Sequence, residues 1–379
     1  MLKIGITGQS GFIGTHLFNT LGLFYDKYKL ISFEDEFFEV EEKLQKFVKS
    51  CDVIVHLAAM NRHNDYKVIY ETNLRLVKKI ISACEETNSA PHILFSSSIQ
   101  EERDNLYGKS KKEGRKLLER WAMDNNARFT GLVIPNVFGP FGHPYYNSVV
   151  ATFCHQLNHG EEPKIEIDGE LNLIYVEELV KVIIDQIEAM RKDSQTSAIA
   201  DTVDLPHTAS LKVSELLGKL NGYKRNYIGS GIIPNLSDPF DRSLFNTFLC
   251  YADHGSLFPF HLKKNSDKRG SFVEIIKSHS KGQFSYSTTK PGITRGNHFH
   301  TRKVERFAVI KGKAMIEFRR IGTDRIFTFE LNAENPSFVD MPIWYTHNIT
   351  NTGNEDLYTF FWISELFDPD DPDSYFEEV

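Results

Sequence analysis

The first half of the chain alternates short hydrophobic runs with longer segments in which hydrophobic residues recur at helical spacing. Four short runs have the length and composition of buried strands: Lys3–Thr7, Val53–Ala58, His92–Phe95 and Phe129–Ile134. Three stretches between them have helical periodicity: a stretch from Phe12 onward, Tyr66–Glu86 and Ser110–Asp124. This alternation predicts an α/β fold built on a parallel sheet.

The pattern changes twice further along the chain. From Asn136 to Phe245 it is mixed, with helices expected at Val176–Arg191 and Leu211–Leu220, and we expect the last strands and a substrate-binding lobe there. From Arg269 onward, short strand-like segments separated by polar turns predict an antiparallel β-barrel or jelly roll. We therefore expect a reductase-type domain at residues 1–245, a linker at 246–262 and a barrel at 263–379. The acidic end, Asp368–Val379, is expected to be a surface strap or a dimer contact.

Composition excludes several classes of protein. The 379 residues carry a formal net charge of −7, which argues against a nucleic-acid or anionic-membrane surface. No hydrophobic run has the length of a membrane span, and the first strand leaves no room for a targeting segment, so we expect a cytoplasmic location. Four cysteines without paired or metal-type spacing are expected to be reduced thiols in the core: Cys51, Cys84, Cys154 and Cys250.

A glycine triplet follows the first strand directly and opens a helix. Gly8, Gly11 and Gly14 have the spacing G-x-x-G-x-x-G, and Phe12 and Ile13 begin the helix. Without side chains, such a turn lets backbone N–H groups approach a pyrophosphate at the helix N-terminus. Leu57, Ala58 and Ala59 follow a later strand, where the small side chains of the two alanines allow a similarly close approach. The sequence therefore predicts a dinucleotide site.

A possible proton-transfer pair lies after the serines Ser96–Ser98. Tyr107 and Lys111 are four residues apart, so they share one face of a helix. An ammonium group beside a phenol lowers the pKa of the phenol, and we expect this to bring the pKa of Tyr107 toward neutrality. Such a tyrosine can exchange a proton with a carbonyl or hydroxyl group while a nicotinamide transfers hydride.

On these motifs, residues 1–245 resemble the extended short-chain dehydrogenases/reductases, which act largely on nucleotide sugars. The resemblance implies that Ser98 orients the substrate carbonyl, Tyr107 donates the proton and Lys111 holds the ribose, with Asn73 also in the cofactor site. It places Asn136, Asn147 and His155 among the substrate contacts. The interval from Ser98 to Tyr107 is shorter than usual for the family, which leaves Ser96 and Ser97 as alternatives.

The choice of nicotinamide cofactor stays open at this stage. The second strand is expected at about Lys29–Phe33, followed by Glu34 and Asp35. A carboxylate at the end of this strand would accept a hydrogen bond from a ribose 2′-hydroxyl and repel a 2′-phosphate, which favours NADH. Alternatively, both acids belong to an exposed acidic loop.

A second chemistry is indicated near the C-terminus by His298, His300, Glu305 and His347. Two histidines separated by one residue point to the same side of a strand, and Glu305 and His347 are expected on neighbouring strands. Three imidazoles and a carboxylate suit zinc or a similar divalent metal.

The spacing Gly292–His298–His300–Glu305–Gly312 matches the first cupin motif, and residues 263–379 resemble that family. Pro342, His347 and Asn351 match the second motif, with Trp344 in place of its usual glycine, a change expected to narrow the barrel mouth. The segment also resembles sugar-nucleotide 3,5-epimerases of the cupin class, in which the corresponding histidine is a metal-free base. The epimerase base is thus not assigned; its candidates are Lys290, Arg295, His298 and Tyr345.

Over its whole length the chain resembles bacterial bifunctional capsular-polysaccharide enzymes, in which a reductase domain precedes a cupin. The resemblance implies epimerisation at carbon 3 of a UDP-4-keto-2-acetamido-2,6-dideoxyhexose, followed by reduction of carbon 4 with NADPH. The product would be UDP-2-acetamido-2,6-dideoxy-L-talose, on the way to UDP-N-acetyl-L-fucosamine. It also implies zinc and a homodimer. Two alternatives are a reductase whose barrel is only structural or dimerising, and a non-enzymatic nucleotide sensor.

Overall fold

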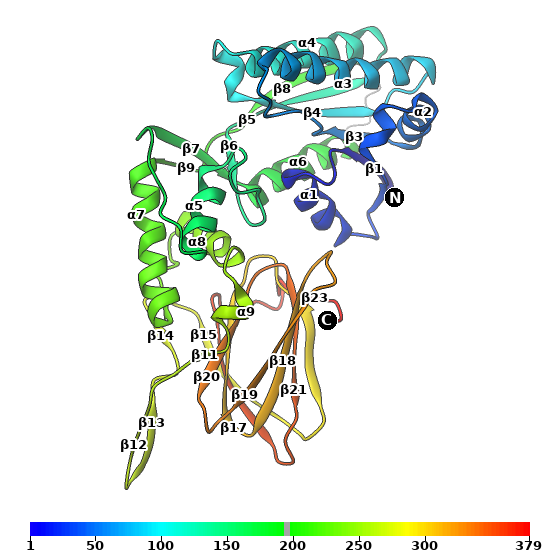
Figure 1. Ribbon diagram of the computed structural model, residues 1–379. Coiled ribbons are helices and arrows are strands. Elements are labelled where there is room, and N and C mark those ends of the chain that lie inside the picture. Colours follow the sequence, from blue (N-terminus) through cyan, green and yellow to red (C-terminus); the bar gives the residue numbers. More distant parts are fainter. Residues whose placement is uncertain (193–197) are drawn as a thin grey trace. The chain divides into compact units, whose positions relative to one another are not determined.

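The computed structural model describes residues 1–192 and 198–379, which form two compact units (Figure 1). Unit 1 comprises residues 1–138, 142–149 and 169–211, and unit 2 comprises residues 139–141, 150–168 and 212–379. Residues 150–168 and 212–245, expected in the reductase-type domain, therefore group with the C-terminal unit. The reductase-type domain at 1–245 and the barrel domain at 263–379 remain predictions.

Unit 1 is built on a parallel sheet of six strands in the order β2-β1-β3-β4-β5-β8. Its strands are β1 (Leu2–Thr7), β2 (Tyr28–Ile31), β3 (Val53–His56), β4 (His92–Ser98), β5 (Arg128–Ile134) and β8 (Ile199–Asp204). Its helices are α1 (Phe12–Gly22), η1 (Asp35–Phe38), α2 (Glu41–Ser50), α3 (Tyr66–Glu86), η2 (Ile99–Glu102), α4 (Leu106–Asp124) and α6 (Val176–Lys192).

The sheet is covered on both faces because its strands are apolar on both sides. Figure 1 shows α3 and α4 together on one face of the sheet and α1 and α6 on the other. Side chains alternate accordingly: Ile54 packs in the cluster with α3 and α4, whereas Val53 and Val55 pack with α1 and α6. A small sheet in the order β6-β7-β9 completes this unit: β6 (Asn136–Phe138), β7 (Glu170–Tyr175) and β9 (Ala209–Lys212).

Unit 2 contains a barrel of two five-stranded antiparallel sheets. The first sheet contains, in spatial order, β11 (Phe260–His261), β20 (Ser337–Met341), β17 (Glu305–Lys311), β22 (Leu357–Ile363) and β15 (Gln283–Thr289). The second contains β19 (Ile326–Asn332), β18 (Lys313–Arg320), β21 (Tyr345–Asn351), β16 (Thr294–Phe299) and β23 (Tyr375–Phe376). One hydrophobic cluster joins the two sheets, for example through Val339 of β20 and Phe318 of β18.

The rest of unit 2 is helical, with two short two-stranded sheets. Its helices are α5 (Val149–Asn158), α7 (Val213–Tyr223), the π-helix η3 (Lys224–Ile228), α8 (Pro239–Cys250) and α9 (His254–Leu257). The small sheets pair β10 (Ile232–Ile233) with β14 (Lys277–Ser278), and β12 (Lys264–Asp267) with β13 (Gly270–Val273). The segment expected as a linker, 246–262, is therefore structured: it holds the end of α8, all of α9 and β11.

Candidate functional site

The glycine turn of unit 1 has the close contacts that a dinucleotide requires. Gly8 has a φ of +69°, and a Cβ atom added there would lie 2.9 Å from the backbone nitrogen of Ala58. A Cβ atom at Gly14 would lie 2.2 Å from the carbonyl oxygen of Gly8. Helix α1 begins at Phe12 after Gly11, which has no side chain to cap the helix. The first N–H groups of α1 therefore have no side-chain cap at Gly11 and can accept a phosphate, so the residues fit a dinucleotide.

The loop after β3 is fixed beside this turn. The backbone N–H of Leu57 donates to the carbonyl oxygen of Thr7 at 3.2 Å, and that of Ala58 donates to its hydroxyl at 3.3 Å. From α3, the buried amide of Asn73 accepts from the N–H of Met60 at 2.7 Å and donates to its carbonyl oxygen at 3.1 Å. Asn73, predicted in the cofactor site, thus holds the loop that contains Leu57–Ala59.

The three serines at the end of β4 have different partners. Ser96 donates to the carbonyl oxygen of His56 at 3.2 Å, and Ser97 donates to the carboxylate of Glu101. The hydroxyl oxygen of Ser98 accepts from the backbone N–H two residues later at 3.2 Å. Among the described contacts, only Ser98 keeps its hydroxyl hydrogen free for a substrate oxygen. This geometry favours Ser98 over its two neighbours.

Tyr107 and Lys111 lie in the first two turns of α4, as the sequence predicts. The Nζ atom of Lys111 lies 5.8 Å from the ring centroid of Tyr107 and donates to the carbonyl oxygen of Ser96 at 2.9 Å. Burial raises the pKa of Tyr107 to about 12 and lowers the pKa of Lys111 to about 8. Burial therefore acts against the expectation that the ammonium brings the pKa of Tyr107 toward neutrality.

The short interval between Ser98 and Tyr107 is occupied by one turn of 3-10 helix, η2. Its buried Glu101 accepts from Nε of Arg115 at 3.0 Å and from Nη2 at 2.8 Å. Sequence reasoning missed this pair. A signal was present, because Arg115 follows Lys111 by four residues and therefore shares its helix face.

The predicted substrate residues are divided between the units. Asn136 is exposed at the start of β6 in unit 1, and Asn147, also in unit 1, donates to the carbonyl oxygen of Asn61 at 3.2 Å. His155 lies on α5 in unit 2, with its ring 4.0 Å from that of His159. All three stay predictions about substrate contacts.

One residue near Asn147 was missed by sequence reasoning. The guanidinium group of Arg62 donates to the carbonyl oxygens of Tyr145 and Tyr146. Arg62 thereby ties the loop that follows β3 to the segment that precedes α5. Nothing in the local sequence pattern indicates this contact.

Strand β2 ends earlier than expected. Its last residue is Ile31, and the exposed acids Glu34 and Asp35 stand at the start of η1. Neither carboxylate therefore occupies the last position of the strand, where a ribose-binding acid is expected. The reason is the packing of the core, since Phe33 turns inward and packs against Phe38 and Phe47.

The four predicted metal ligands of unit 2 converge. Their ligand atoms all lie within 4.8 Å of one another, and three of the four side chains are buried: His300, Glu305 and His347. His298 and His347 face each other in register on β16 and β21. Glu305 comes from β17 in the other sheet, so the expectation that it lies on a strand next to that of His347 is wrong. The site is closed by the two sheets together.

In this cluster the carboxylate of Glu305 lies beside the imidazole rings of His300 and His347. Nε2 of His347 lies 3.1 Å from Oε2 of Glu305, and Nε2 of His300 lies 3.4 Å from Oε1. Burial alone would raise the pKa of Glu305, but the two histidines outweigh it and hold that pKa well below its ordinary value. Burial, aided by the other two histidines, lowers the pKa of His298 to about 4. His298 is thus neutral near pH 7, the form that binds metals.

These residues fit a zinc ion. The set of three nitrogens and one carboxylate oxygen is one that zinc accepts. Nε2 of His300 is buried and faces Oε1 of Glu305 at 3.4 Å, so it lies inside the cluster where a metal ligand is needed. Trp344, expected to narrow a barrel mouth, is instead buried and stacks on Phe299.

Among the candidate bases, Tyr345 packs in the hydrophobic cluster of the barrel, and burial raises its pKa. Lys290 and Arg295 are exposed. His298 is half-buried within the metal cluster. The geometry thus disfavours Tyr345 and leaves the assignment of the base open.

Two family models match separate parts of this chain. Residues 4–199 match the model of the NAD dependent epimerase/dehydratase family. The chain belongs to this family. Residues 265–375 match a second model, the polysaccharide biosynthesis C-terminal domain.

Two relatives are similar over the whole chain. UDP-2-acetamido-2,6-beta-L-arabino-hexul-4-ose reductase from Pseudomonas aeruginosa is 32% identical over 99% of this chain and 98% of its own. The capsular polysaccharide assembling protein CapF from Staphylococcus aureus is 35% identical over 100% of both chains, with a TM-score of 0.62. The full-length resemblance to bacterial capsular-polysaccharide enzymes and the α/β-plus-barrel fold class are confirmed.

A second solved structure resembles the fold alone. RMD from Pseudomonas aeruginosa, complexed with NADPH, is 18% identical over 59% of this chain and 82% of its own, with a TM-score of 0.52. Within the part of the chain that the structure describes, no helix has both the length and the apolar character of a membrane span.

Proposed function

We propose that this chain is a bifunctional nucleotide-sugar enzyme that epimerises and then reduces a UDP-linked 4-keto sugar. The barrel epimerises carbon 3 of UDP-4-keto-2-acetamido-2,6-dideoxyhexose. Unit 1 reduces carbon 4 with NADPH, and the product is UDP-2-acetamido-2,6-dideoxy-L-talose, in a pathway to UDP-N-acetyl-L-fucosamine. The observation that carries the proposal is that one chain holds both a Ser98–Tyr107–Lys111 constellation and a buried cluster of three histidines and Glu305.

The reductase half is supported by the geometry of β4 and α4 and by the similarity to the Pseudomonas enzyme, which is named a reductase. When bound, the nicotinamide supplies the hydride for carbon 4. Tyr107 gives the phenolic proton to the oxygen of that carbon, and Ser98 donates a hydrogen bond that orients the same oxygen. Lys111 binds the cofactor ribose, and its positive charge stabilises the phenolate that remains on Tyr107.

Chemistry sets the order of the two reactions. A hydrogen on carbon 3 is acidic only while carbon 4 is a ketone, so inversion at carbon 3 has to precede reduction. Removal of the proton on one face and its return on the other inverts the carbon. His298, His300, Glu305 and His347 would hold a divalent metal, whose positive charge would stabilise developing negative charge on a substrate oxygen.

The cofactor proposals are NADPH for unit 1 and zinc for the barrel. The position of Glu34 and Asp35 beyond the end of β2 supports NADPH, because no carboxylate stands at the last residue of that strand to repel a 2′-phosphate. A side-by-side titration with NADPH and NADH tests this choice, and tighter binding of NADH would contradict it. A homodimer is also part of the proposal.

Product analysis tests the function as a whole. The protein is incubated with the 4-keto sugar nucleotide and NADPH, and the configurations at carbons 3 and 4 of the product are read by NMR. The proposal expects inversion at carbon 3 together with reduction at carbon 4. A product reduced at carbon 4 with carbon 3 unchanged would instead favour a reductase whose barrel is structural or dimerising.

A further inference from the structure

A buried carboxylate near the C-terminus binds the loop that connects two of the metal ligands. Asp373 is 2% exposed although it lies in an acidic stretch expected at the surface. Its Oδ1 accepts from the backbone N–H of Thr301 at 3.0 Å and from its hydroxyl at 2.7 Å. Its Oδ2 accepts from the backbone N–H groups of Arg302 and Lys303 at 3.1 and 3.2 Å. Four donors thus converge on the Asp373 side chain, and all four belong to residues 301–303, which lie between His300 and Glu305 in the sequence.

The main chain of the same residue contacts a ligand directly. Nδ1 of His300 is hydrogen-bonded to the carbonyl oxygen of Asp373. A carbonyl oxygen can only accept, so the hydrogen of the neutral imidazole resides on Nδ1. The lone pair is then on Nε2, the atom that faces Oε1 of Glu305 at 3.4 Å. Asp373 therefore selects the tautomer in which His300 can bind a metal through Nε2.

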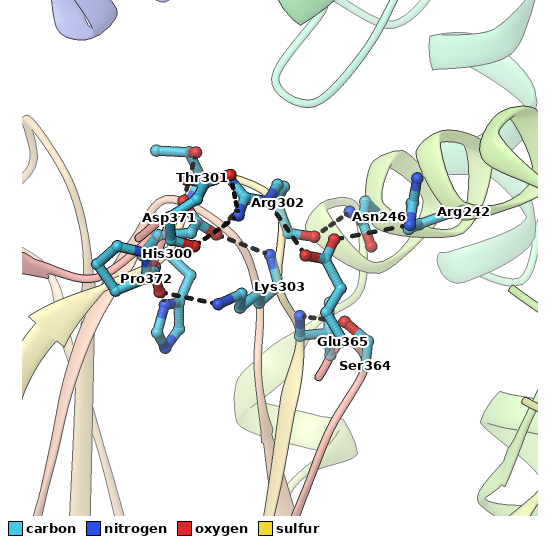
Figure 2. Close-up of polar contacts among 12 residues, drawn as sticks. Arg242, Asn246, His300, Thr301, Arg302, Lys303, Ser364, Glu365, Asp371 and Pro372 are labelled. Carbon is cyan, nitrogen blue, oxygen red and sulfur yellow. Dashed lines mark hydrogen bonds and ion pairs between the residues drawn. The ribbon is translucent and has the colours of Figure 1, made fainter. Parts of the chain in front are cut away.

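Further contacts hold the C-terminal segment, which we define as residues 371–378, against the barrel (Figure 2). Nζ of Lys303 donates to the carbonyl oxygen of Pro372 at 2.8 Å, and Nη2 of Arg302 lies 2.8 Å from the carboxylate of Asp371. Arg302 also pairs with Glu365, and its carbonyl oxygen accepts from Asn246 of α8. Beyond Asp373, β23 pairs antiparallel with His298 and Phe299 of β16.

We infer that Asp373 is a positioning residue for the metal centre. The C-terminal segment clamps the 301–303 loop through the Asp373 side chain and orients His300 through the Asp373 main chain. Its strand β23 also lies against His298, a second ligand. This inference rests on the metal site of the proposed function. It goes beyond that site because it makes the last residues of the chain a determinant of metal affinity.

Zinc affinity measured on the full-length protein tests the inference. The variant is Asp373→Asn, which keeps the size of the side chain. Asparagine, like aspartate, tolerates the φ of +40° at this position. The substitution replaces Oδ2, which accepts from two N–H groups, with an amide NH2 group, which can only donate. The matched control is Asp370→Asn, in the same acidic stretch, whose side chain is exposed. Dissociation constants are measured by competition with a chromophoric zinc chelator, without substrate.

Asp373→Asn is expected to weaken zinc binding about 10- to 100-fold, the usual effect of losing an outer-shell partner, while Asp370→Asn leaves it unchanged. If near-UV circular dichroism shows that Asp373→Asn does not fold, zinc affinity is measured on Thr301→Val instead. That variant removes one of the four donors and is expected to give a smaller loss. If folded Asp373→Asn binds zinc with the wild-type affinity, the inference is overturned and the metal site stands. A wild-type protein that binds no zinc overturns the metal site, and the inference with it.

Discussion

Nε2 of His347 lies 3.1 Å from Oε2 of Glu305, although the two residues come from different sheets of the barrel. The pair joins β21 to β17 at the centre of the metal cluster. Without a metal it is a buried imidazole–carboxylate contact, and with one both atoms become ligands. The stability of the barrel should therefore depend on zinc.

Zinc at about 100 times its dissociation constant should stabilise the barrel by about 2.7 kcal/mol. The measurement is a thermal or urea unfolding curve with and without added zinc. Glu305→Gln should abolish most of this gain, because a neutral amide is a poor zinc ligand and leaves the three imidazoles without their anion. A matched control is Glu355→Gln, an exposed acid of the same barrel whose partner is Lys311. An equal zinc effect in Glu305→Gln and in the wild type would contradict the assignment of Glu305.

Tyr107→Phe should lower the reduction rate by about 10²- to 10⁴-fold, the usual contribution of a positioned proton donor. Cofactor affinity should stay near the wild-type value, because the ring and Lys111 remain. The control is Tyr70→Phe on α3, whose hydroxyl donates to Glu113 and takes no part in the proposed chemistry. Reduction at the wild-type rate in Tyr107→Phe would remove Tyr107 from the mechanism and would also reopen the nucleotide-sensor alternative.

Gly14→Ala should weaken the affinity for NADPH by at least about tenfold. A Cβ atom there would lie 2.2 Å from the carbonyl oxygen of Gly8, so the turn has to move away from the phosphate position. Gly22→Ala is the matched control at the other end of α1, where an added Cβ meets nothing within 4 Å. Fluorescence titration with NADPH measures both. Equal loss in the two variants would indicate a general effect on α1 rather than a phosphate-binding turn.

Lys111 should make unit 1 more stable as the pH rises above 8. Burial lowers its folded-state pKa to about 8, below the ordinary value of 10.5. The unfolded chain therefore binds more protons between these values, and the cost of the buried charge, fully present below pH 8, disappears as the pH approaches 10.5. In Lys111→Met this gain is absent. The melting temperature of the variant minus that of the wild type should thus fall between pH 7 and pH 10, and a constant difference would contradict the lowered pKa.

Much of this architecture can be predicted from the sequence, because its signals are local. Helix α3 has the predicted bounds, Tyr66–Glu86, since its hydrophobic period extends over many turns. Tyr107 and Lys111 share a helix face by spacing alone. Part of the metal cluster is predictable for a similar reason, because His298 on β16 and His300 directly after its end are separated by one residue.

The parts that could not be predicted depend on contacts distant in sequence. Asp373 meets Thr301 and the two residues after it across about seventy positions, and its own stretch has the composition of an exposed tail. Glu305 reaches the histidines from the opposite sheet, and the packing of one sheet on another leaves no periodic signal that names the facing strand. The early end of β2 reflects the packing of Phe33 in the core, where tertiary contacts override the local pattern.

The central claim is that the barrel activates carbon 3 of a 4-keto sugar independently of hydride transfer. The most direct test incubates the zinc-loaded protein with the UDP-4-keto sugar in heavy water without any nicotinamide, and follows deuterium by NMR and mass spectrometry. The account predicts deuterium at carbon 3, also in Tyr107→Phe, and its loss in His347→Ala. A protein that binds zinc and reduces a pre-epimerised ketone, yet incorporates no deuterium at carbon 3, would contradict it.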